Sequence, residues 1–199
     1  MKTGLQKTGM ALFFICGVFM LVYAMGFVSA VYVFFAYGNK QLLEFYNEMQ
    51  AVNKGLLWKA IAVILLALFL YILELNRHPA GPITLILTVI VCAAGLVISV
   101  QTLALLAGLR REYSGLDLTV LKRYIDRGTI RFKYSTFVYD MGLALYAALA
   151  LVSVFTAAAV TRTAMTVRGV FSRDTSAQSM SEQGEPVQGA GSTDAKGKA

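Results

Sequence analysis

Uncharged, largely apolar stretches recur four times along the chain, at residues 8–39, 60–73, 79–109 and 141–161. Because an α-helix rises ~1.5 Å per residue, ~20 apolar residues cross a hydrocarbon core of ~30 Å. The second stretch is the shortest. It reaches spanning length over residues 55–75 when the charged ends of Lys59 and Glu74 extend toward the headgroups. The pattern predicts an all-α membrane protein, a bundle of four transmembrane helices at about residues 10–37, 55–75, 82–109 and 134–161.

The connection between the first two spans, residues 38–54, is polar but patterned. Apolar side chains recur there at helical spacing, opposite a polar face that includes Gln41, Glu44 and Glu48; the apolar set is Leu42, Phe45, Tyr46, Met49 and Val52. A helix with one apolar and one polar face lies flat on a membrane surface. We therefore expect a short amphipathic surface helix in this connection.

The connection between the third and fourth spans, residues 110–133, is the most charged part of the chain. Ser114 followed by Asp117 resembles a capped helix start, an apolar stripe follows at residues 120–125, and Gly128 is typical of a helix end. A second amphipathic surface helix, more basic than the first, is predicted here.

Both ends of the chain need separate interpretation. Residues 172–199 are rich in Ser, Gly and Gln and are predicted to form a disordered polar tail, which leaves residues 1–171 as the membrane domain. At the other end, a charged start and an apolar run resemble a cleavable signal peptide over residues 1–30. The run is too long for one, which favours an uncleaved first span, although cleavage stays an alternative.

The formal charge of +7 resides in the membrane domain and its connections rather than in the tail, whose acidic residues outnumber its basic ones. Anionic lipid headgroups are the expected partner of this charge, and nucleic acid is not expected. More Lys and Arg lie on the side of connections 38–54 and 110–133 than on the other side. The positive-inside rule therefore predicts that these connections are cytoplasmic, whereas Lys2 and Lys7 favour the opposite orientation.

Polar residues inside the spans are few, and one from each span falls at a similar depth. Measured along each helix from the opposite membrane surface at ~1.5 Å per residue, they lie ~27 to 33 Å away; they are Ser29, Lys59, Gln101 and Asp140. One interpretation is a hydrophilic intramembrane layer in which Asp140 attracts cations and Lys59 is its partner. The alternative is structural, with Lys59 extending to the interface and the others bonding within or between helices.

Other candidate side chains have simpler interpretations. Glu74 stands three residues before Arg77, so these two are expected to form an ion pair at the interface; the alternative is that Glu74 is an entry or exit group for cations. The single histidine, His78, lies in a turn without neighbouring ligands, so no metal site or haem is predicted. Cys16 and Cys92 stand alone inside spans and are expected to act as small apolar residues rather than as a redox pair.

The sequence contains no motif that indicates catalysis. It has no zinc-protease signature, no nucleophile and base pair, and no glycine-rich phosphate loop, so we expect no enzymatic activity and no cofactor. Two functions remain. The first is a non-catalytic membrane subunit or scaffold that packs with partner membrane proteins or with itself. The alternative is a small oligomeric pore or transporter that uses the polar layer around Asp140.

Overall fold

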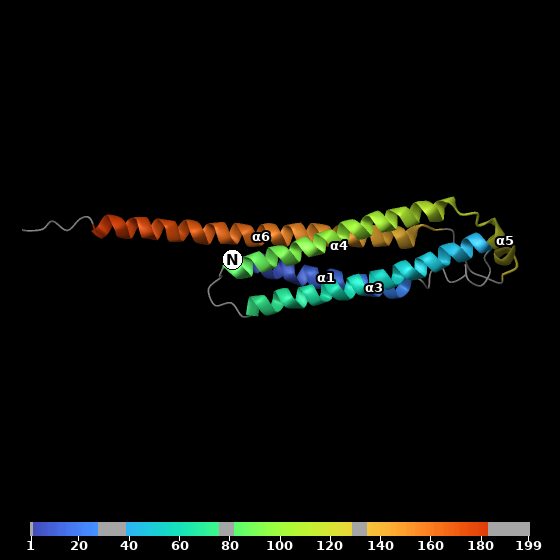
Figure 1. Ribbon diagram of the computed structural model, residues 1–199, viewed down its shortest axis with the longest axis horizontal. Helices are drawn as coiled ribbons and strands as arrows, with labels where there is room; N and C mark the ends of the chain where they lie inside the picture. Colours follow the sequence, from blue (N-terminus) through green and yellow to red (C-terminus); the bar gives the residue numbers. More distant parts are fainter. Residues whose placement is uncertain (1, 28–38, 76–81, 129–134, 183–199) are drawn as a thin grey trace, which may run out of the picture. The chain divides into compact units, whose positions relative to one another are not determined.

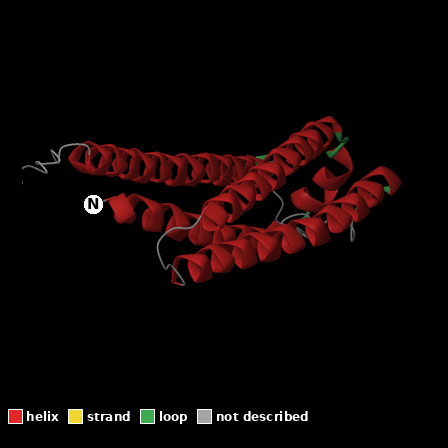
Figure 2. Cartoon of the chain, turned by 60° about the vertical axis from the view of Figure 1, so that its left-hand side comes forward, coloured by secondary structure: helices red, strands yellow, loops and turns green. Residues whose placement is uncertain are grey.

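The computed structural model describes residues 2–27, 39–75, 82–128 and 135–182, of which residues 2, 3, 5, 6, 74, 75, 82 and 163–182 are described by their backbone only. These ranges contain helices and short loops and no strand (Figure 2). In chain order the helices are α1 (Lys2–Phe27), α3 (Lys40–Leu75), α4 (Pro82–Gly115), α5 (Thr119–Asp126) and α6 (Phe137–Glu182) (Figure 1). The chain divides into two units, residues 1–162 and 163–199, and the packing described below belongs to the first.

Four helices are long and apolar enough to cross a membrane, over Lys7–Phe27, Lys40–Leu73, Ile83–Gly115 and Phe137–Arg162. The prediction of an all-helical protein with four candidate spans is therefore confirmed. Many large apolar side chains on these helices are exposed at the surface of the chain, as expected where lipid or another apolar surface surrounds a protein. The chain is thus compatible with a multi-pass integral membrane protein.

Asn39 sets the start of α3. Its side-chain oxygen Oδ1 accepts a hydrogen bond from the Leu42 backbone N–H at 2.9 Å, which is the geometry of a helix N-cap. From Lys40 the helix continues without a break to Leu75. The separate surface helix predicted for residues 38–54 is corrected accordingly, since residues 40–54 are the first turns of α3. Their apolar face is buried within the protein at Leu42, Phe45 and Met49.

The short helix α5 lies in the connection where a second surface helix is predicted. It begins at Thr119 rather than at Ser114, whose hydroxyl instead donates to the Arg110 carbonyl in the last turns of α4 at 2.8 Å. Gly128 follows its end with a φ of 68°, a left-handed conformation that glycine adopts easily. Within α5, the side chain of Leu121 is fully buried. The location of α5 on a membrane surface stays a prediction.

Close approach between helices depends on glycine, as Gly17 and Gly95 illustrate. A Cβ atom added to Gly17 of α1 would lie 2.9 Å from Ile64 Cγ1 and 3.3 Å from the Ile64 backbone nitrogen on α3. One added to Gly95 of α4 would lie 2.8 Å from Phe13 Cζ on α1 and 2.9 Å from Ser153 Oγ on α6. Small residues at such points let the helix backbones pack closely in a bilayer, where packing contacts drive helix association.

Helix α6 extends to Glu182 and so includes residues 172–182 of the predicted tail. The remaining residues of that tail, 183–199, lie outside the described part of the chain. Disorder of the tail and the boundary at residue 172 stay predictions.

Candidate functional site

Asp140 is the centre of a polar contact between α4 and α6. Its Oδ1 atom lies 2.7 Å from Arg110 Nε, and its Oδ2 atom accepts a hydrogen bond from the Thr136 hydroxyl at 2.7 Å. The Arg110 and Asp140 side chains are 47% and 45% exposed, so the pair lies at the edge of the bundle rather than in its core. Each carboxylate oxygen therefore has a partner within the chain.

The position of this pair along its helices explains why it forms. Ser135 and Thr136 start α6: the Ser135 hydroxyl accepts from the Phe137 N–H at 3.1 Å, and the Thr136 carbonyl accepts from the Asp140 N–H at 3.0 Å. Asp140 thus lies in the first turn of α6, where the helix dipole favours an anion. Arg110 lies toward the end of α4, where the dipole favours a cation. The ion pair closes the chain segment that connects the two helices.

Lys59 makes a separate contact between α3 and α4. Its Nζ atom donates to Thr102 Oγ1 at 3.1 Å, and the Thr102 hydroxyl donates in turn to the Ile98 carbonyl at 2.7 Å. Thr102 is buried, and Lys59 is partly buried. Thr102 precedes Arg110 by about two helical turns, or ~12 Å along α4. The two polar contacts therefore lie at different levels of the bundle.

The other predicted site residues are not brought together with these contacts. Gln101 is exposed, next to the buried Thr102 that bonds Lys59. Ser29 and Arg77 lie outside the described residues, as does the side chain of Glu74. The four-residue layer and the Glu74–Arg77 pair consequently stay predictions. Cys16 and Cys92 are buried and free.

A chain of aromatic rings, which we call the aromatic cluster, joins all four long helices near the Arg110–Asp140 pair. Successive ring centroids lie 5.4, 6.1, 5.2 and 6.1 Å apart, and the rings in order are Tyr23, Phe27, Tyr139, Tyr113 and Phe45. All five side chains are buried. Aromatic pairs at these separations stabilise contacts beyond the area that they bury. The interior at this end of the bundle is filled by rings.

Hydroxyl groups in the interior bond mostly to their own helices. Ser99, Ser153 and Thr156 each donate to the carbonyl four residues earlier, at 2.7 to 2.9 Å. The hydroxyls of Tyr23 and Tyr146 are buried and have no hydrogen-bond partner within the described part of the chain. Polar atoms are therefore present in the core, and most of those with partners bond within a single helix. The exceptions are Thr102, which accepts from Lys59 on α3, and the Tyr139 hydroxyl, which donates to Met49 Sδ on α3.

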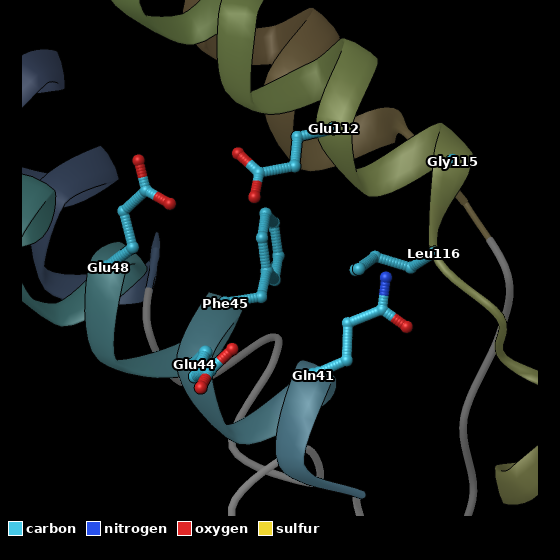
Figure 3. Close-up of a pocket in the computed structure, with 7 residues that line it drawn as sticks. All are labelled: Gln41, Glu44, Phe45, Glu48, Glu112, Gly115 and Leu116. Atoms are coloured by element: carbon cyan, nitrogen blue, oxygen red, sulfur yellow. The ribbon is translucent and has the colours of Figure 1, made fainter.

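A hollow of about 520 Å³ opens between the first turns of α3 and the last turns of α4. Figure 3 shows its side chains on the two facing helices, with the buried Phe45 among them. Three of the lining residues are acidic: Glu44, Glu48 and Glu112. Glu44 also pairs with Lys40 at 3.8 Å. Within the described residues, no group of three or more His, Cys, Asp or Glu side chains is arranged to hold a metal ion.

The sequence interpretation missed the partners of its two charged site residues. Arg110 counts in the sequence only as a positive charge of connection 110–133, and Thr102 carries no signal. The placement of Asp140 within four residues of a Ser-Thr pair was the available sign that it belongs to a helix start.

Comparisons of the chain with protein-family models, with curated proteins and with solved structures find no match.

Proposed function

We propose that the protein is a non-catalytic integral membrane subunit, which packs against a partner membrane protein or a second copy of itself. The observation that carries this proposal is the aromatic cluster. Rings from all four long helices fill one end of the bundle, so a substrate path through the bundle would have to pass them.

The polar contacts support the same role. Arg110 with Asp140 ties α4 to α6, and Lys59 with Thr102 ties α3 to α4, so all three charged residues have partners on another helix. Paired charges in a bundle cost less than unpaired ones and fix the register of the helices. A bundle held together in this way suits a protein that acts by binding other chains through its surface.

That surface is rich in apolar side chains. On α1, Phe19, Val22 and Met25 are exposed at about one-turn spacing by 60%, 62% and 73%. Such a face is satisfied equally by lipid or by another apolar helix. A subunit that docks through this face needs no chemistry of its own.

The test is purification of the full chain from its native membrane in a mild detergent, followed by native mass spectrometry and identification of all chains present. A complex of fixed stoichiometry, with another protein or with further copies, is expected. The variant Val22→Lys puts a charge on the exposed face of α1 and should reduce complex formation. The control is Val97→Lys, which changes a similarly exposed side chain on α4. A chain that is monomeric at every detergent concentration, including after cross-linking in the membrane, would refute the subunit role.

One observation favours a second function, an oligomeric pore or transporter. The Asp140 carboxylate is about half exposed, so in an oligomer it is available to line a path between chains. Asp140→Asn keeps the size of the side chain and removes its charge. If the pore function holds, this variant changes cation flux into proteoliposomes while the oligomer stays intact; equal flux in wild type, Asp140→Asn and empty liposomes argues against it.

A further inference from the structure

A second hollow, of about 660 Å³, lies between α1 and α3 at the opposite end from the aromatic cluster. We call it the α1–α3 groove, and the residues used here are Lys7, Ala11, Phe14, Ala67, Leu68 and Tyr71. Its volume falls in the range of small-molecule sites, ~300 to 1,000 Å³, and far exceeds the ~30 Å³ of a water molecule. The groove is therefore large enough for part of a lipid rather than for solvent alone.

The composition of the groove changes along its length. Lys7 is exposed and stands where the candidate span of α1 begins, so in a bilayer we expect its ammonium group at headgroup level. Tyr71 from α3 is also exposed, and tyrosine is a typical residue of the membrane interface. From Lys7 to Phe14 the lining runs ~10 Å along α1 and becomes apolar. A polar mouth thus leads into an apolar wall.

The positive charge of Lys7 at the mouth of the α1–α3 groove favours anionic lipids. Within the described residues Lys7 has no ion-pair partner, so its positive charge is available to a ligand. A lipid phosphate is the anion that is present at this depth, and an acyl chain fits the apolar wall below it. Zwitterionic lipids also carry a phosphate, but their own cation competes with Lys7 for it.

We propose that the α1–α3 groove binds one anionic phospholipid, with its phosphate at Lys7 and the upper part of an acyl chain against Phe14 and Leu68. This inference goes beyond the proposed subunit function, because it assigns a ligand to a groove that helix docking does not require. It also differs from a general attraction between basic connections and anionic membranes, since it locates one lipid at one lysine on the other side of the bundle.

The test uses the full chain in nanodiscs that contain equal amounts of phosphatidylglycerol and phosphatidylcholine with identical acyl chains. After exchange into a delipidating detergent, native mass spectrometry counts each lipid that stays bound. Wild type should retain one phosphatidylglycerol in preference to phosphatidylcholine. Lys7→Gln should lower phosphatidylglycerol retention roughly fivefold, as expected for one lysine near a lipid headgroup, and leave phosphatidylcholine unchanged.

Matched controls separate the groove from the remaining surface. Lys54→Gln removes an exposed lysine from α3 outside the groove and should retain lipid as wild type does. Ala11→Phe fills the groove at an exposed position and should lower retention of both lipids, whereas Leu12→Phe enlarges the neighbouring side chain, which does not line it.

The proposal is overturned if Lys7→Gln retains phosphatidylglycerol as wild type does, or if Lys54→Gln loses as much. Circular dichroism of each variant checks that the helices are intact, and Lys7→Gln decides the matter alone should Ala11→Phe fail to fold. Lys7→Gln leaves the exposed apolar side chains Phe19, Val22 and Met25 of α1 unchanged, so association with partner chains and retention of lipid can fail separately.

Discussion

The Nε atom of Arg110 lies 2.7 Å from Asp140 Oδ1 and joins the last turns of α4 to the first turn of α6. The chain between these residues includes α5 and returns to the bundle at Asp140. The pair thus fixes where α6 starts relative to α4.

A double-mutant cycle with Arg110→Gln and Asp140→Asn measures this contact. Because both side chains are about half exposed, we expect a coupling free energy of ~0.2 to 1 kcal/mol, the range of exposed ion pairs. The measurement is reversible unfolding of the single and double variants in mixed detergent micelles.

A second cycle provides the control. Lys59 bonds to Thr102 rather than to Asp140, so the effects of Lys59→Met and Asp140→Asn should add to within ~0.5 kcal/mol. Equal coupling in the two cycles would mean that Asp140 responds to charge in general and not to Arg110 in particular.

Gly95→Ala should lower the free energy of unfolding by ~1 to 3 kcal/mol, the usual cost of overpacking. The added methyl group meets the ring of Phe13 and the Ser153 hydroxyl, at 2.8 and 2.9 Å, and both side chains are buried. Gly108→Ala is the matched control on the same helix. Nothing lies within 4 Å of its added Cβ, so this change should stabilise the helix by ~0.5 to 1 kcal/mol. Effects of the same sign at both positions would contradict the packing described for α4.

Tyr146→Phe should raise the free energy of unfolding by ~1 kcal/mol. The Tyr146 side chain is fully buried, and its hydroxyl has no partner among the described residues, so removing the hydroxyl relieves an unsatisfied polar group. Tyr139→Phe is the comparison, because the Tyr139 hydroxyl donates to Met49 Sδ at 3.5 Å and its loss brings no such relief. Destabilisation by Tyr146→Phe in unfolding experiments would reveal a partner for that hydroxyl.

Asp117 should make the stability of the start of α5 depend on pH. The Thr119 hydroxyl and backbone N–H donate to Asp117 Oδ1 at 2.6 and 3.0 Å, and these bonds hold the pKa of the carboxyl below its ordinary value. A lowered pKa means that the carboxylate stabilises the start of α5 above the ordinary pKa of ~3.9, and that this stabilisation is lost as the pH falls through the lowered value.

The lowered pKa of Asp117 can be measured by carbon NMR of its carboxyl group as a function of pH. Thr119→Val keeps the backbone donor and removes the hydroxyl, so the pKa should rise toward its ordinary value, whereas Thr119→Ser should leave it near that of wild type. Identical titration curves for the wild type and Thr119→Val would exclude the hydroxyl as the cause.

The four spans were predictable because length and apolar character alone decide whether a helix crosses a bilayer. The packing of the first turns of α3 was not predictable from the sequence. The apolar spacing of Leu42, Phe45 and Met49 is genuine, but periodicity does not say whether the apolar face meets lipid headgroups or protein. Here it meets protein, since Phe45 packs against Tyr113 of α4, with ring centroids 6.1 Å apart.

The partner of Asp140 was likewise not predictable from the sequence. The sequence singles it out as the acid of the last span, but its partner depends on how α4 and α6 align, which no local pattern encodes. Counting residues along straight helices suggests a common depth for Asp140 and Lys59, whereas their partners on α4 are about two turns apart. Depth measured along single helices does not replace the register between them.

The unbroken helix α3 has a mechanical consequence. Its 36 residues extend ~54 Å, well beyond a hydrocarbon core of ~30 Å, so in a bilayer several of its turns would extend past the lipid as a continuous rod. The buried contact between Phe45 and Tyr113 couples this rod to the end of α4. Glu44 and Glu48 stand on this rod, and no break in the helix separates them from Leu75 at its other end.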